Sequence, residues 1–262
     1  MNFYTRASND WQKIKKAWVY VNEWKPVKKA WVYDGSQYVH QANIAHPGNT
    51  PGTFGSSISV TPDAEQTMAY VARVSNPANQ NNTETSEKLV RYLIKNQHWS
   101  PLEMVSVCLE IETTRDIARQ ILRHRSFSFQ EFSQRYANAS QLGFELKEAR
   151  MQDLKNRQNS VKTDNLALQA WWEERQNKVL RECKEAYQWA LDSGIAKEQA
   201  RAVLPEGMTG SRLYMNGTLR SWVHYIQLRS ANGTQKEHRD IALACADAIE
   251  SIFPMIKEFI SK

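Results

Sequence analysis

The chain has 262 residues, of which 41% are hydrophobic and 24% charged, so it can bury a sizeable core and is not a wholly disordered protein. Its formal net charge of +6 favours an anionic partner, but charge alone does not distinguish a nucleotide from a nucleic acid or a merely soluble basic surface. No stretch approaches the roughly 20 apolar residues of a membrane-spanning helix, and the first residues lack the apolar core of a signal peptide. We therefore expect no membrane association and a cytoplasmic location.

Three cysteines, Cys108, Cys183 and Cys245, lie far apart in the sequence, with neither a CxxC motif nor a Cys/His ligand spacing. This pattern argues against a structural zinc site and against a disulfide framework. We expect buried free thiols and no bound metal.

An internal repeat opens the chain. Residues 11–20 and 24–33 both begin with Trp and end in Lys-Lys-Ala-Trp-Val-Tyr, in register. Alternating aromatic and β-branched residues flank Asp34-Gly35, which readily adopts the positive φ angles of a tight hairpin turn. We therefore expect a small β-hairpin appendage over residues 1–40. Its Trp and Lys pairs either bind a glycan or nucleic acid or simply form a half-buried sheet.

A flexible linker is predicted at residues 41–57, where Gly and Pro are concentrated without a hydrophobic period. One main domain should follow over residues 58–262, with an α+β fold of mixed helices and short strands. Strands are predicted at 58–60 and 105–111, and helices at 62–74, 87–96, 115–124, 166–191, 197–203, 219–229 and 236–253. Thr113 and Asp116 have the spacing of a capping box for the third helix. Ser193-Gly194 should end the long fourth helix, with Pro205 a stop and Pro254 a kink.

Polar side chains gather at the end of the third predicted helix and in the segment that follows. Gln120 and Arg123 are three residues apart, so an amide and a guanidinium share one helical face. If the following segment runs extended, Glu131, Ser133 and Arg135 project from one side of it. Guanidinium and hydroxyl donors suit a phosphate monoester, and amide-like groups suit a uracil edge. The alternative is an arginine-rich helix end that complements the helix dipole, with local hydrogen bonds in a turn.

The segment from Arg123 to Tyr136 closely resembles the signature of the flavin-dependent thymidylate synthases, RHRxxSxNExSxRY. The chain matches it at Arg123, His124, Arg125, Ser128, Glu131, Ser133, Arg135 and Tyr136. Gln130 stands where the family usually has Asn. Four further segments resemble the family in the same order, namely Ala72–Ser75, His98–Glu103, Arg201–Pro205 and Leu219–Tyr225 with Leu228-Arg229. The resemblance covers roughly Ile58 to the C-terminus.

This resemblance implies an enzyme that methylates dUMP to dTMP, with 5,10-methylenetetrahydrofolate as carbon donor and FAD reduced by NADPH. It also implies a homotetramer with shared active sites. The substrate contacts that it implies are Gln120, Arg123, Glu131, Ser133, Arg135, Arg201 and Arg229. The FAD contacts that it implies are Ser75, His98, Ser100, Glu103, Arg123, His124, Arg125, Glu131, Arg220 and His224.

Two of these residues are candidates for a catalytic role. The resemblance implies that Arg229 approaches the base from another subunit, where it would stabilise charge developing on the ring. Ser133 invites a nucleophile reading, but no His or Asp at an evident spacing would activate it, so we expect it to contact dUMP. Arg220 and His224 share a helical face, whereas Arg229 points elsewhere. Gly233 falls where some relatives carry a flavin-contacting His.

Two other functions stay open. The basic charge and the Trp/Lys repeats suit a nucleic-acid-binding protein, whose affinity would fall steeply with added salt. The same repeats also suit a structural viral protein with an inactive enzyme-like domain. Neither function explains the signature, so we expect no nucleic-acid partner. Because no GxGxxG or Walker pattern occurs, flavin binding would not use a Rossmann fold.

Overall fold

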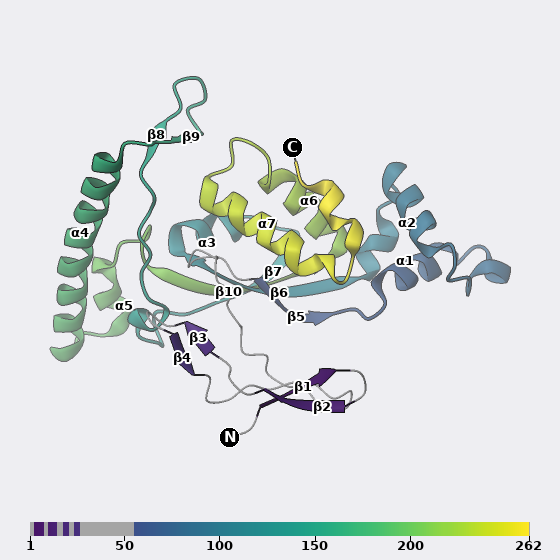
Figure 1. The fold of residues 1–262 in the computed structure, drawn as a ribbon, viewed down its shortest axis with the longest axis horizontal. Coiled ribbons are helices and arrows are strands. Elements are labelled where there is room, and N and C mark those ends of the chain that lie inside the picture. Colours follow the sequence, from purple (N-terminus) through teal and green to yellow (C-terminus); the bar gives the residue numbers. More distant parts are fainter. Residues whose placement is uncertain (1–2, 8–9, 15–17, 21–23, 27–54, 262) are drawn as a thin grey trace. The chain divides into compact units, whose positions relative to one another are not determined.

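The computed structural model describes residues 3–7, 10–14, 18–20, 24–26 and 55–261, and the chain divides into two compact units, Met1–Pro51 and Gly52–Lys262 (Figure 1). The first unit contains two antiparallel strand pairs, β1 (Phe3–Ala7) with β2 (Asp10–Ile14) and β3 (Trp18–Tyr20) with β4 (Trp24–Pro26). The hairpin predicted around Asp34-Gly35 lies outside the described residues, as does most of the predicted linker. Both stay predictions.

A four-stranded antiparallel sheet forms the centre of the second unit, in the order β5-β6-β10-β7. Its strands are β5 (Gly55–Val60), β6 (Ser106–Thr114), β7 (Phe127–Glu131) and β10 (Gly210–Thr218). The apolar residues of β6 alternate, which places Val107, Leu109 and Ile111 in the core. Gly217 of β10 lies opposite Phe127, and a Cβ there would come within 2.3 Å of the Phe127 ring. β10 therefore needs a glycine where the signature strand β7 packs on it.

Helices cover the sheet and extend beyond it. They are α1 (Ala64–Ala72), α2 (Ser86–Lys95), α3 (Arg115–Ile121), α4 (Leu166–Asp192), α5 (Lys197–Ala200), α6 (Leu219–Arg229) and α7 (Lys236–Glu250). Short 3-10 helices are η1 (Pro77–Asn79), η2 (Ser100–Met104), η3 (Ala139–Leu142), η4 (Arg201–Val203) and η5 (Pro254–Phe259). Figure 1 shows α6 and α7 together over one face of the sheet. Trp222 of α6 is fully buried, and its indole Nε1 donates to the carbonyl of Val107 at 3.0 Å, which fixes α6 on β6.

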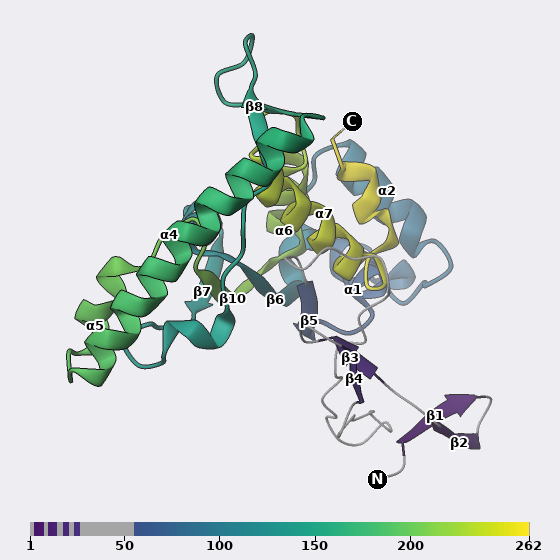
Figure 2. The ribbon, with the colours of Figure 1, turned by 60° about the vertical axis from the view of Figure 1, so that its left-hand side comes forward.

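The long helix α4 has few buried side chains. Its start is capped by Asn165, whose side chain accepts from the Leu168 amide, and Gly194 follows its end with a φ of 80°. Figure 2 shows α5 beside one end of α4 and β8 (Arg150–Gln152) near the other, where β8 forms a hairpin with β9 (Ser160–Lys162). No helix in the described part of the chain is both long enough and apolar enough to span a membrane.

The structure confirms the α+β fold of the main domain and corrects several local predictions. The strands β8, β9 and β10 were not predicted. The helix α3 begins after Thr114, whose hydroxyl bonds the Asp116 carboxylate, so the capping box at Thr113 is wrong. The helix predicted to end at residue 253 ends at Glu250, and Pro254 begins a 3-10 helix instead of a kink.

Two further expectations fail in part. Because β7 ends at Glu131 and residues 133–136 form a turn, Glu131, Ser133 and Arg135 do not project from one strand. All three cysteines are free, but only Cys245 is fully buried, whereas Cys108 and Cys183 are half-buried.

Candidate functional site

A histidine at the end of α3 is held without charge. His124 Nε2 accepts a hydrogen bond from Arg229 Nε at 2.9 Å, and its ring meets that of Tyr225 edge-on, with 4.9 Å between centroids. Burial lowers the pKa of His124 from 6.5 to about 4, with the cations of Arg229 and Arg123 acting in the same direction. His124 is therefore a neutral acceptor near neutral pH. This hydrogen bond brings together two predicted site residues, His124 after α3 and Arg229 on α6.

A buried residue that sequence reasoning missed lies beside this pair. His238 of α7 is fully buried, with Nδ1 3.2 Å from Gln120 Oε1 and Nε2 3.1 Å from Tyr225 Oη. Burial is the main cause that lowers its pKa to about 3. The signal that could have revealed it is periodicity, because His238 precedes the buried Ile241 and Cys245 by three and seven residues on one helical face.

Several predicted flavin contacts gather where α6 meets η2. The Arg220 guanidinium forms an ion pair with the Glu103 carboxylate, which joins the two elements. One turn further along α6, His224 packs edge-on against Trp99, with 4.8 Å between ring centroids. Burial and the Arg220 charge lower the pKa of His224. Ser100, Glu103, Arg220 and His224 thus lie on adjoining elements.

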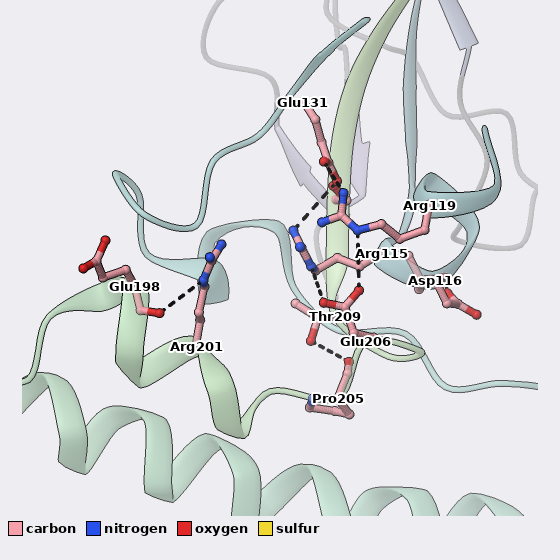
Figure 3. A network of polar contacts seen from close by, with 11 residues as sticks. Arg115, Asp116, Arg119, Glu131, Glu198, Arg201, Pro205, Glu206 and Thr209 are labelled. Atoms are coloured by element: carbon pink, nitrogen blue, oxygen red, sulfur yellow. Dashed lines mark hydrogen bonds and ion pairs between the residues drawn. The ribbon is translucent and has the colours of Figure 1, made fainter. Parts of the chain in front are cut away.

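Glu131, at the end of β7, is held by a charged network (Figure 3). Its Oε2 accepts from Arg119 Nη1 at 2.9 Å, and its Oε1 accepts from Ser211 Oγ at 2.8 Å. The nearly buried Arg115 lies 3.8 Å from the same carboxylate and pairs with Glu206 at 3.0 Å. Both carboxylate oxygens of Glu131 are thus satisfied within the chain. Its observed role is to tie β7 to α3 and β10.

The remaining substrate candidates meet around Glu198. Arg135 Nε lies 3.1 Å from the Glu198 carboxylate, and Arg201 Nε donates to the Glu198 carbonyl at 3.3 Å. The Ser133 carbonyl accepts the amides that close the turn, and its hydroxyl accepts from the Arg135 amide at 3.4 Å. Among the described residues, no His or Asp bonds that hydroxyl. The structure therefore supplies no group that would activate Ser133 as a nucleophile.

Several of the predicted site residues are open to solvent. Ser75, His98, Arg123 and Arg125 are exposed on the surface. A cavity of about 710 Å³ lies beside the β8–β9 hairpin, where Arg150, Trp172 and Gln235 are among its lining residues. None of the predicted site residues lines it.

The α+β fold presents the Arg-His-Arg turn of the signature at the end of α3, the feature by which the sequence resembles the flavin-dependent thymidylate synthases. The family described as thymidylate synthase complementing protein matches residues 57–255. The chain belongs to this family. The Trp/Lys repeats precede the matched residues.

Relatives and a solved structure agree with this membership. A "Probable flavin-dependent thymidylate synthase" of Paramecium bursaria Chlorella virus 1 is 50% identical over 193 residues, which cover 74% of this chain and 88% of the relative. A "Flavin-dependent thymidylate synthase" of Synechocystis sp. is 50% identical over 192 residues, which cover 73% of this chain and 87% of the relative. The structure of a UMP/dUMP methylase, PolB from Streptomyces cacaoi, bound with 5-Br dUMP, superposes with a TM-score of 0.68 and 26% identity, covering 79% of this chain and 93% of that one.

Proposed function

We propose that the protein converts dUMP to dTMP, with 5,10-methylenetetrahydrofolate as carbon donor and with FAD reduced by NADPH. The observation that carries this proposal is the signature between Arg123 and Tyr136, which lies on the turn after α3, on β7 and on the turn after β7 in a chain of this family. A related fold with bound 5-Br dUMP supports the substrate. The two other functions, nucleic-acid binding and a structural role with an inactive domain, leave this match unexplained.

We assign the recognition of dUMP to two groups of side chains. Arg135 and Arg201 meet at Glu198 and offer guanidinium donors suited to a phosphate, with the hydroxyl of Ser133 nearby in sequence. The second group lies at the end of α3 and on α6 and consists of Gln120, Arg123 and Arg229. Glu131, at the end of β7, anchors the strand that connects the two groups.

The neutral His124 has a direct consequence for Arg229. Because His124 accepts from Arg229 Nε, it fixes the guanidinium while adding no second positive charge. Among the described residues, no hydrogen bond occupies the Nη groups of Arg229, so they remain for a ligand. A fixed cation at the uracil ring would stabilise negative charge as that charge develops, and it needs little reorganisation during the reaction.

The residues on η2 and α6 fit a flavin dinucleotide. Arg220 is 42% exposed and could add a phosphate to its pairing with Glu103, and the exposed Ser100 hydroxyl is a further donor. We place Ser75, His98, His224, His124 and Arg125 at the same cofactor. When bound, FAD would supply the redox chemistry, while these side chains bind it and orient it toward dUMP.

We further propose a homotetramer with shared active sites, in the cytoplasm. The predicted contacts fall into separate groups of hydrogen bonds and ion pairs within the described residues, which suits a site completed by a second copy. Large apolar side chains on α4 are exposed, including Leu166 at 76%, Trp171 at 63% and Trp189 at 65%, which suits a surface covered by another subunit.

The test is to purify the full chain, record its visible spectrum, and assay dTMP formation from dUMP, methylenetetrahydrofolate and NADPH. We expect a yellow protein with turnover that Arg123→Ala reduces at least about a hundredfold, because a charged ligand contact is lost. Arg157→Ala, in the exposed β8–β9 loop, is the matched control and should retain turnover. Colourless protein without turnover would contradict the proposal.

A further inference from the structure

A chain of side-chain hydrogen bonds around His238 has a single direction. It ends at Glu237, whose Oε2 accepts from Gln235 Nε2 at 3.0 Å. Because this contact fixes the Gln235 amide, Gln235 Oε1 is an acceptor, and Gln120 Nε2 donates to it at 2.7 Å. The Gln120 carbonyl oxygen must then be the atom that faces His238. The orientation of a predicted substrate-binding amide thus follows from its neighbours.

The same logic fixes the protons on His238. Gln120 Oε1 cannot donate, so His238 Nδ1, 3.2 Å away, must carry the proton. A neutral imidazole carries only one, so Nε2 is an acceptor and the Tyr225 hydroxyl donates to it at 3.1 Å. The bonds therefore run from Tyr225 through His238, Gln120 and Gln235 to Glu237.

The surroundings of His238 keep it in this neutral form. Burial comes first among the causes that lower its pKa, followed by the charge of Arg229 on α6, the charge that His124 carries when protonated, and the charge of Arg123 after α3. Burial also raises the pKa of Tyr225, so this phenol remains protonated and able to donate. The hydrogen-bond directions should hold throughout the neutral and mildly acidic range.

We propose that His238 is a positioning residue that holds the half-buried Gln120 with its amide nitrogen available to the nucleotide. One hydrogen of Gln120 Nε2 bonds to Gln235, and His238 engages the carbonyl oxygen. The second Nε2 hydrogen has no partner in the part of the chain that the structure describes. The ligand group recognised at Gln120 is therefore an acceptor oxygen, of a phosphate or of a uracil carbonyl. A ligand N–H would meet the wrong side of the amide. This inference deepens the proposed function and rests on it for the identity of the ligand.

Substitutions at residue 238 separate positioning from a merely structural role. His238→Asn retains a donor near the Nδ1 position, whereas His238→Gln extends toward Tyr225 and loses the bond to Gln120. Steady-state kinetics should give an unchanged KM for dUMP in His238→Asn and an increase of about tenfold in His238→Gln, the size of one lost hydrogen bond. The value of kcat should change by less than about threefold in both, because the chemical step is not touched. Equal KM values in the two variants, or parallel losses of kcat, would overturn the proposal.

Nitrogen NMR of the wild-type protein, recorded without ligand, tests the same inference independently of catalysis. His238 should show a protonated Nδ1 and an unprotonated Nε2, with no titration from about pH 8 to about pH 5. A protonated Nε2, or titration near the ordinary histidine pKa, would refute the positioning chain even in an active enzyme. If the NMR result holds but the protein neither binds dUMP nor forms dTMP, the proposed function fails and the orientation of Gln120 stands.

Discussion

The end of α3 and the end of β7, which lie on either side of the turn that begins the signature segment, are held in place by different interactions. At the end of α3, Gln120 and His124 lie against the buried His238, and the hydrogen bonds there join mostly uncharged groups. At the end of β7, Glu131 is held by ion pairs with Arg119, which is 47% exposed, and with the nearly buried Arg115. One end depends on a histidine pair remaining unprotonated, and the other depends on charge.

This difference shows that two parts of one short segment can be sensitive to different solution conditions, one to pH and the other to ionic strength. Salt screens exposed ion pairs but has little effect on buried hydrogen bonds. Acid instead affects the buried hydrogen bonds, because a proton added to a buried neutral histidine brings an unpaired charge into the core. The α3 end should therefore respond to pH, and the β7 end to ionic strength.

The largest expected effect is acid destabilisation. The folded-state pKa values of His124 and His238, about 4 and about 3, lie below the unfolded value of 6.5, so the unfolded chain binds more protons at acid pH. Their contribution to stability is complete above about pH 6.5 and is lost as the pH falls toward the folded values. We expect a loss on the order of 2–4 kcal/mol between about pH 6.5 and pH 4, measured by urea unfolding.

His238→Asn is the control for this effect, because it removes the buried titrating group. Its stability should fall less steeply with acid than that of the wild type, and added salt should not restore the difference. An identical pH profile in the variant would assign the acid sensitivity to other groups.

A second prediction concerns the strand that connects the two ends. Gly217→Ala places a Cβ 2.3 Å from the Phe127 ring, so β7 or β10 must shift, and we expect a loss of about 1–3 kcal/mol in urea unfolding. Gly207→Ala is the matched control, because its nearest contact is a side-chain oxygen of Asp116 at 4.0 Å. Equal stability in the two variants would show that the Gly217–Phe127 packing is not a constraint.

A smaller effect is expected from Glu131→Gln, which keeps the shape of the side chain and removes its charge. The Arg119 contact loses its ionic character, and the nearly buried Arg115 loses a nearby anion, so unfolding free energy should fall by about 1–2 kcal/mol. The difference from the wild type should shrink at high salt, because the wild-type pairs are screened. A salt-independent difference would contradict the proposed contrast between the two ends.

The smallest effect belongs to the Arg135–Glu198 pair. Their side chains are 60% and 46% exposed, so a double-mutant cycle with Arg135→Gln and Glu198→Gln should give a coupling below about 1 kcal/mol. Glu198→Gln should still leave Arg135 free to meet a phosphate. A coupling of several kcal/mol would mean that this pair is a structural element of the loop.

Much of the fold followed from periodicity and the rest from tertiary context. The long helix α4 was predicted almost to its ends, because its apolar spacing and the stop at Gly194 act locally. The central strand β10 was missed, since Gly210, Asn216 and Gly217 lower its strand propensity. Its identity comes from pairing with β6 and β7, which no local pattern encodes.

The site was predictable in its residue types and not in its arrangement. The family resemblance identified Gln120 and Arg229, but the turn after β7 and the grouping of the side chains depend on where α3, β7 and α5 pack. His238 was not predicted as a site residue, because a lone histidine among charged neighbours is typical of a solvent-exposed helix face. Only the packing of α7 shows that it is buried against Tyr225.

The different burial of the three free thiols makes their labelling rates a measure of local opening of the fold. Cys245, on α7, is 1% exposed, and burial raises its pKa well above the ordinary value, so the native thiol should resist alkylation. Cys183 on α4 and Cys108 on β6 are half-buried and should react sooner. The rate at which Cys245 becomes labelled therefore measures how often α7 lifts from the sheet. Because α7 also carries His238, the same rate measures how often the contact between His238 and Gln120 opens.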